Sequence, residues 1–139
     1  MVERPNEVFL SHSSANRRFA RKVAGILRAH GVPVWYSERS IKGAEQWHDE
    51  IGKALRRCDW FMILLTTKAV GSEWVKRELL YVLDDERYNG RIVPLHYRTC
   101  DYNKLSWVLG GFEFIDLRRN QKEGFRELLR IWGIGYNPA

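Results

Sequence analysis

Residues 60–65 read WFMILL, the longest uninterrupted apolar run in the chain. Six residues cannot cross a membrane, which takes about 20 apolar residues in a helix. A short run without polar interruptions is typical of a strand that is buried on both faces of a sheet. Strands of this kind occur in parallel sheets covered by helices on either side, so the run predicts an α/β fold.

Short apolar runs alternate with helical patterns before and after this stretch. We predict five strands, at Val8–Leu10, Val32–Trp35, Phe61–Leu65, Ile92–Leu95 and Phe112–Leu117. Apolar residues at helical spacing predict four helices, carried by Phe19, Val23, Ile26 and Leu27; by Trp47, Ile51, Ala54 and Leu55; by Val75, Leu79 and Val82; and by Phe125, Leu128, Leu129 and Trp132. Gly31 is placed to close the first helix. Residues 99–111 show no clear period, which predicts a short helix or a loop.

The bulk composition sets the size of the core. With 139 residues, 45% of them hydrophobic, the chain is long enough for one substantial core and too short for two ordinary domains. We expect a single domain over residues 1–139, with its core at about 7–134. The first residues are polar and unlike a secretion signal, and no run is long enough to span a membrane. These features predict a cytoplasmic protein without a membrane partner.

Cysteines and charge exclude further classes of site. Cys58 and Cys100 are far apart and lack the neighbouring His or Cys spacing of a zinc site, so we expect reduced thiols and no metal. The net charge of +6 invites a nucleic-acid partner. However, Lys and Arg are spread over every predicted helix, and no groove-reading motif is recognisable. We therefore expect no nucleic-acid partner.

Open parallel sheets bind ligands beyond the carboxyl ends of their strands. The loop after the first strand, SHSS, offers a serine as helix cap, while Ser11 and His12 are candidate ligand contacts or simple loop hydrogen bonds. The loop after the second strand is long, and its candidate contacts are Ser37, Arg39, Lys42 and Trp47, with the two cations for phosphate and the indole for stacking. The alternative for Trp47 is a core anchor of the second helix.

The third loop leads into SEWVKRELL, residues 72–80. At about 100° per residue, Val75 and Leu79 face the sheet, while Trp74 and Glu78 share the adjacent edge of the helix. This geometry predicts Glu78 at the rim of the cleft. Two interpretations are open from spacing: a solvated or ion-paired surface carboxylate, or the carboxylate that carries the chemistry.

Three stretches, in this order, resemble motifs of the Toll/interleukin receptor (TIR) domain family, especially its prokaryotic members. VFLSHSS (8–14) is similar to the first box, and VPVWYSERSIKGAEQWHDEI (32–51) to the second strand and the BB loop. CDWFMILLT (58–66) followed by SEWVKREL (72–79) resembles the third strand and the helix with a tryptophan, three residues and a glutamate. The resemblance covers about residues 8–117. It implies a flavodoxin-like three-layer α/β sandwich whose five-stranded parallel sheet has the order 2-1-3-4-5.

The resemblance also implies an activity. Many TIR domains cleave the nicotinamide–ribose bond of NAD⁺, releasing nicotinamide with ADP-ribose or a cyclic isomer, and prokaryotic members commonly act in antiphage defence. Carried over, the catalytic residue is Glu78, with Trp74 beside the nicotinamide; NAD⁺ is the substrate and no cofactor is required. Nicotinamide leaves from a positively charged nitrogen, so the second carboxylate of an ordinary glycosidase is not needed. The family further implies self-association through TIR–TIR contacts and a downstream effector that senses a cyclic product.

The second loop departs from the family pattern. Ser37 stands where relatives often have aspartate, and Lys42-Gly43-Ala44 where a proline–glycine pair is common. The alternative function is a non-enzymatic interaction module that docks to other TIR domains through this loop and its helices. A dehydrogenase is disfavoured, because neither a Walker-type phosphate loop nor a strand–GxGxxG–helix motif is present.

Overall fold

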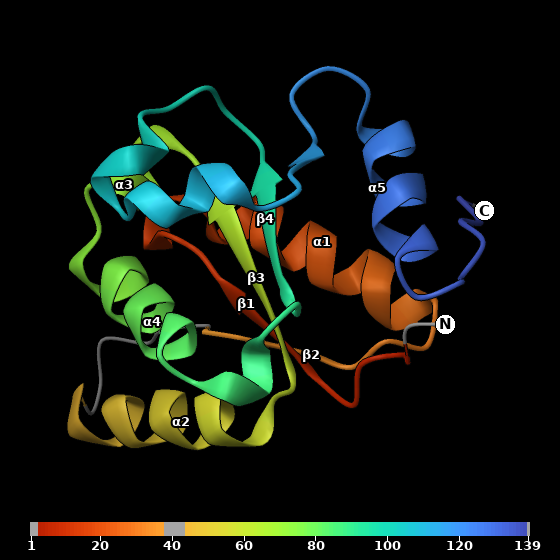
Figure 1. The fold of residues 1–139 in the computed structure, drawn as a ribbon. Coiled ribbons are helices and arrows are strands. Elements are labelled where there is room, and N and C mark those ends of the chain that lie inside the picture. The colour runs from red at the N-terminus through yellow and green to blue at the C-terminus, as the bar shows by residue number, and fades with distance from the viewer. Residues whose placement is uncertain (1–2, 38–43, 139) are drawn as a thin grey trace.

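The computed structural model describes residues 3–37 and 44–138, and at residues 44–47 only the backbone. Within these residues, five strands form one parallel sheet in the order β2-β1-β3-β4-β5 (Figure 1). The strands are β1 (Val8–Ser11), β2 (Val34–Tyr36), β3 (Trp60–Leu65), β4 (Ile92–His96) and β5 (Ile115–Asp116). The predicted order and direction of the strands are confirmed.

Helices cover both faces of the sheet (Figure 1). One face carries α1 (Arg17–Ala29) and α5 (Gln121–Arg130), and the other carries α2 (Ala44–Arg57), α3 (Thr67–Val70) and α4 (Glu73–Leu83). Short 3-10 helices form parts of the connections: η1 (Ser14–Asn16), η2 (Glu86–Tyr88), η3 (Tyr102–Lys104) and η4 (Trp107–Gly111). The predicted three-layer sandwich is confirmed, and the segment without a clear period contains η3 and η4.

The central strand β3 is buried along its whole length. Side chains alternate across a strand, so Met62 and Leu64 pack with α1 and α5, while Phe61 and Ile63 pack with α2 and α4. Each of the two helical layers therefore packs against alternate residues of β3, which is why no position within the strand is polar.

Strand β5 is shorter than the predicted range 112–117. Only Ile115 and Asp116 pair with β4. The carbonyl of Arg91 accepts a hydrogen bond from β3. Along a strand, the backbone polar groups of successive residues point alternately to the two neighbouring strands, so those of Pro94, three residues further on, face β5. Proline has no N–H to donate to the ladder, and pairing therefore stops at this point.

Strand β2 begins two residues later than predicted. The N–H of Val32 donates to the carbonyl of Leu27 at 2.9 Å, which closes the end of α1. Gly31 adopts a φ of 81° in this closure, as predicted for the residue that ends the helix. Val32 therefore belongs to the helix terminus and not to the strand.

Helix α5 also ends before the predicted position. It stops at Arg130, and Trp132 lies in the turn that follows, where Gly133 has a φ of 70°. Trp132 is still only 2% exposed, so the residue was correctly predicted to be in the core although it is not helical.

The two cysteines are free thiols in different surroundings. Cys58 is fully buried after α2, and this burial raises the pKa of its thiol to about 12. Since the thiolate is the reactive form, we expect Cys58 of the folded protein to react with a thiol reagent such as DTNB on the order of a thousandfold more slowly than an exposed cysteine. The absorbance of the thionitrobenzoate that leaves DTNB, followed in native buffer and in guanidinium, measures this difference. Equal rates in both solvents would contradict it.

None of the helices in the described part of the chain is long and apolar enough to span a membrane.

Candidate functional site

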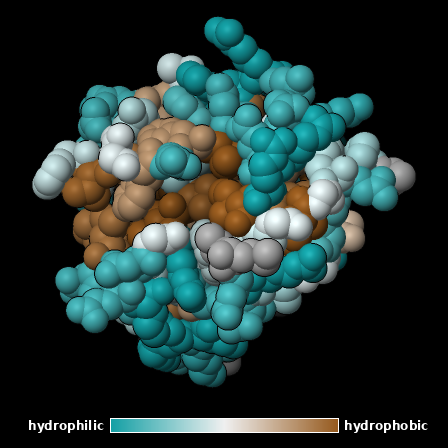
Figure 2. Space-filling model, turned by 45° about the vertical axis from the view of Figure 1, so that its right-hand side comes forward, coloured by the Kyte–Doolittle hydropathy of each residue, from teal (hydrophilic) through white to brown (hydrophobic). Residues whose placement is uncertain are grey.

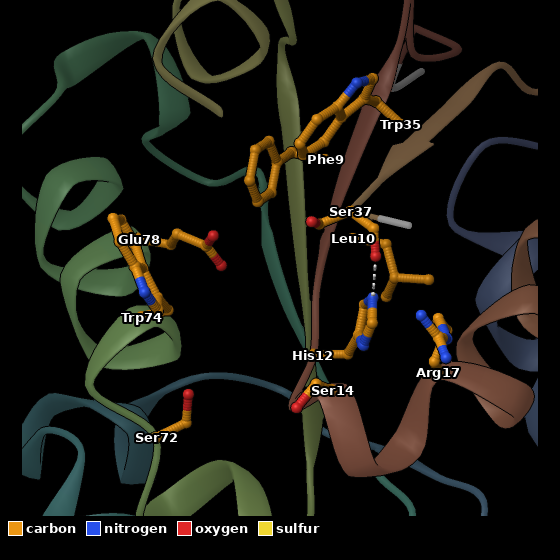
Figure 3. A pocket seen from close by; sticks show the side chains of 10 residues that line it. All are labelled: Phe9, Leu10, His12, Ser14, Arg17, Trp35, Ser37, Ser72, Trp74 and Glu78. Atoms are coloured by element: carbon orange, nitrogen blue, oxygen red, sulfur yellow. Dashed lines mark hydrogen bonds between the residues drawn. The ribbon is translucent and has the colours of Figure 1, made fainter. Parts of the chain in front are cut away.

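A narrow cavity lies at the carboxyl edge of the sheet, beside the ends of β1 and β2 and the start of α4 (Figure 3). Its free volume is about 20 Å³, room for about one water molecule. The described residues that line it are Phe9, Leu10, His12, Ser14, Arg17, Trp35, Ser37, Ser72, Trp74 and Glu78.

Helix α4 places Glu78 in this cavity. Ser72 caps the helix, its hydroxyl accepting the N–H of Val75 at 3.3 Å. Val75 and Leu79 are fully buried against the sheet, and this packing turns the neighbouring edge of the helix toward the ends of the strands. Glu78 is only 5% exposed, and its carboxylate points into the cavity (Figure 3). The interpretation of Glu78 as a solvated surface charge is therefore wrong.

Ser11 supports the carboxylate from β1. Its hydroxyl donates to Oε1 of Glu78 over 2.6 Å, within the range of O–H···O⁻ bonds to an ionised acceptor. Ser11 is 1% exposed and is absent from the described lining. It thus stands behind Glu78, and its contact with a substrate stays a prediction.

Trp74 lies one helical turn before Glu78 and lines the same cavity. Its indole and the ring of His48 on α2 pack edge to face, with centroids 4.5 Å apart, and the guanidinium of Arg77 lies over the indole, 5.3 Å from its centroid. The structure therefore brings together an aromatic ring and a buried carboxylate, as the four-residue spacing predicted.

His12 joins the first loop to the end of β2. Its Nδ1 lies 2.8 Å from the carbonyl of Ser13, and its Nε2 lies 3.2 Å from the carbonyl of Ser37 (Figure 3). A neutral imidazole can donate to only one of these two oxygens, whereas the protonated ring can donate to both. His12 and Ser37 thus both line the cavity and are joined across it by this contact.

Three predicted residues cannot be placed in this way. Arg39 and Lys42 lie outside the described residues, and Trp47 lies in α2 with its side chain outside them.

Sequence reasoning missed several lining residues, of which Phe9 and Trp35 have a readable signal. They lie two residues before Ser11 and Ser37, and so on the same strand faces. The two pair in register across β1 and β2, with ring centroids 5.0 Å apart. A search of each strand for the residue two positions before its polar end would have found them.

Arg17 follows η1 at the start of α1 and is a lining residue for which the sequence carried no comparable signal. Its place depends on the connection between β1 and α1, which turns α1 toward the cavity.

Comparison with known proteins agrees with this fold. A segment of 98 residues is 29% identical to the NAD(+) hydrolase PdTIR of Paracoccus denitrificans, covering 68% of this chain and 32% of that protein. A segment of 104 residues is 31% identical to the 2′ cyclic ADP-D-ribose synthase AbTIR of Acinetobacter baumannii, covering 73% of this chain and 38% of that protein. The chain thus spans about a third of the length of these two relatives.

A solved structure extends the similarity to the whole fold. The TIR domain of the Toll-related receptor TRR-2 from Hydra magnipapillata matches this chain with a TM-score of 0.72 at 15% identity, covering 90% of this chain and 96% of that one. The model of the TIR domain family matches residues 8–129. This match and the 2-1-3-4-5 sheet show that the chain belongs to the TIR domain family.

Proposed function

We propose that this chain cleaves the bond between nicotinamide and ribose in NAD⁺, as a glycohydrolase or an ADP-ribosyl cyclase. The observation that carries the proposal is the carboxylate of Glu78, buried in a cavity at the carboxyl edge of the sheet beside Trp74. The names of the two bacterial relatives describe NAD⁺ hydrolysis and cyclic ADP-ribose synthesis. Both reactions begin by breaking the same bond.

One carboxylate suffices for this cleavage. Nicotinamide is bonded to C1′ of the ribose through a positively charged nitrogen, and it leaves as a neutral molecule with the electrons of that bond. Positive charge then grows on the ribose, and Glu78 opposes it in surroundings from which water is largely excluded. Among the described lining residues Glu78 is the only acid, which matches a reaction that needs no general acid.

The ribosyl centre is then captured by a nucleophile. Attack by water forms the new bond to C1′, releases a proton and yields ADP-ribose. Attack by a nucleophile of the same ADP-ribosyl unit yields a cyclic isomer and likewise releases a proton. In the cyclic case, we propose that a downstream effector reads the product in antiphage defence.

The decisive experiment is incubation of the protein with NAD⁺ over a wide range of protein concentrations. Nicotinamide and the ADP-ribose products are separated by chromatography and quantified. We expect one nicotinamide for each NAD⁺ consumed, and a specific activity that rises with protein concentration because TIR–TIR contacts complete the site. The absence of nicotinamide at every concentration, including protein immobilised at high density, would overturn the proposal.

Trp74 provides a test of how the cavity binds NAD⁺. We expect Trp74→Ala to raise the KM for NAD⁺ about tenfold, because stacking of a base on an aromatic ring contributes about 1–3 kcal/mol. Initial rates of nicotinamide release over a range of NAD⁺ concentrations measure the effect. Trp74→Phe keeps an aromatic face and should recover most of the loss. An unchanged KM in Trp74→Ala would contradict a contact between Trp74 and NAD⁺.

A second candidate function is an interaction module that associates with other TIR domains. The supporting observation is the exposure of large apolar side chains: Trp107 is 82% exposed, Leu80 48% and Tyr81 41%. Figure 2 shows an apolar band across one face, bordered by hydrophilic side chains. Tryptophan and tyrosine at a surface suit an interface. A pure interaction module would self-associate without consuming NAD⁺, which the same assay detects.

A further inference from the structure

The hydroxyl of Ser11 occupies a position that the fold would otherwise fill with an apolar side chain. Ser11 is the last residue of β1, where it pairs with Ile63 of β3. Its side chain shares a strand face with Phe9, which belongs to the apolar cluster beneath α2 and α4. A buried hydroxyl without a partner is destabilising, because it loses its hydrogen bonds to water, so a serine here requires a specific bond.

That bond is made to the carboxylate of Glu78. The two side chains are 67 residues apart in sequence and meet at 2.6 Å. Both are almost completely buried, at 1% and 5% exposure. A charge-assisted hydrogen bond between buried groups is stronger than its exposed counterpart, because water does not compete for either partner.

We propose that Ser11 is a positioning residue that holds the carboxylate of Glu78 in the orientation and the charged state required for NAD⁺ cleavage. This inference rests on the proposed function, and it assigns Ser11 a role that needs no contact with the substrate. The hydroxyl donates to Oε1, which limits rotation of the carboxylate about its last side-chain bond. A donor that faces the carboxylate also favours its charged form over the neutral acid.

The test compares Ser11→Ala with Ser11→Thr, which keeps a hydroxyl, and with Ser13→Ala as a matched control. Ser13 is also a buried serine, at 7% exposure, but its hydroxyl accepts the N–H of Ala15 in the same loop. The other ionisable side chains of the described lining, His12 and Arg17, are the same in all three variants. Circular dichroism confirms that each variant is folded.

In Ser11→Ala we expect the acid limb of the pH–rate profile to move up by about one pH unit. The reason is that a hydrogen bond to a charged group favours the charged form over the protonated form by the equivalent of about one to two pH units. The kcat should fall about ten- to a hundredfold, with the KM within about threefold of wild type. Ser11→Thr should recover most of the kcat, and Ser13→Ala should leave the acid limb in place. A limb that stays in place in Ser11→Ala, or that moves equally in Ser13→Ala, would overturn the assignment.

A second readout does not depend on NAD⁺ cleavage. The side-chain carboxyl carbon of Glu78 can be followed by ¹³C NMR against pH, and its signal is assigned by its loss in Glu78→Gln. Its titration midpoint should rise by about one pH unit in Ser11→Ala. An unmoved midpoint overturns the coupling whether or not the wild type is active. A raised midpoint in a protein that never releases nicotinamide supports the coupling and overturns the proposed function alone.

Discussion

Glu78→Gln should reduce nicotinamide release from NAD⁺ by at least about a thousandfold, equivalent to about 4 kcal/mol in the activation free energy. Glutamine keeps the size of the side chain and can still accept the hydrogen bond of Ser11, so the packing of α4 is retained. What is lost is the negative charge that opposes the growing positive charge on the ribose. Because Glu78 is 5% exposed, water can replace little of that charge.

The matched control is Glu73→Gln on the same helix. Glu73 is exposed in the first turn of α4 and does not belong to the described lining of the cavity. Its substitution weakens only a favourable interaction with the helix dipole, worth about 0.3–1 kcal/mol of stability. Nicotinamide release should stay within about twofold of wild type. Equal activity of wild type and Glu78→Gln would contradict the catalytic assignment.

Sedimentation of the wild type and of Glu78→Gln separates the two candidate functions. If self-association is the main function, Glu78→Gln should associate as the wild type does and no NAD⁺ should be consumed by either protein. If the chain is an enzyme, Glu78→Gln should associate normally while its NAD⁺ cleavage is lost.

Gly124→Ala should lower the free energy of unfolding by about 2 kcal/mol, which corresponds to a Tm roughly 5–10 °C lower. A Cβ added to Gly124 would lie 2.5 Å from Cδ2 of Leu117 and 2.6 Å from the backbone oxygen of Asp116. The leucine can adopt another rotamer. The backbone oxygen, however, is fixed in β5, so this close contact is relieved only if α5 shifts away from the sheet. The cost of this shift exceeds the gain of about 1 kcal/mol that alanine brings to a helix interior.

The control for this prediction is Gly25→Ala in α1. A Cβ at Gly25 would find no atom within 4 Å, so only the helix preference of alanine acts. We expect this variant to be more stable than wild type by about 0.5–1 kcal/mol. Thermal and urea unfolding of both variants measure the two effects. Destabilisation of similar size in both proteins would show that the contact with β5 is not the cause.

Local patterns predicted the elements of this fold because each element must bury a face. WFMILL predicted a central parallel strand, since a strand covered on both sides tolerates no polar residue. Element ends were predicted less well, because they depend on backbone partners. Val32 is taken by the terminus of α1, and Pro94 ends the pairing of β5.

The candidate site, like the fold, was predicted only where local patterns carry the information. The spacing of Trp74 and Glu78 on one helix predicted that they share an edge, and the resemblance to TIR domains singled out Glu78. Periodicity left its exposure open, because residues beside an apolar stripe face either solvent or a neighbouring element. The bond from Ser11 joins β1 to α4 across 67 residues, and no local pattern contains it.

The order of strands and helices along the chain and the two-sided burial of β3 were thus already contained in the chain of residues, because they follow from the periods of strand and helix. The candidacy of Glu78 came from the resemblance of its stretch to the TIR domain family. The burial of Glu78, its bond with Ser11 and the joining of His12 to Ser37 depended on the packed sheet. They exist because parallel strands bring their carboxyl ends to one edge, where side chains from distant segments meet.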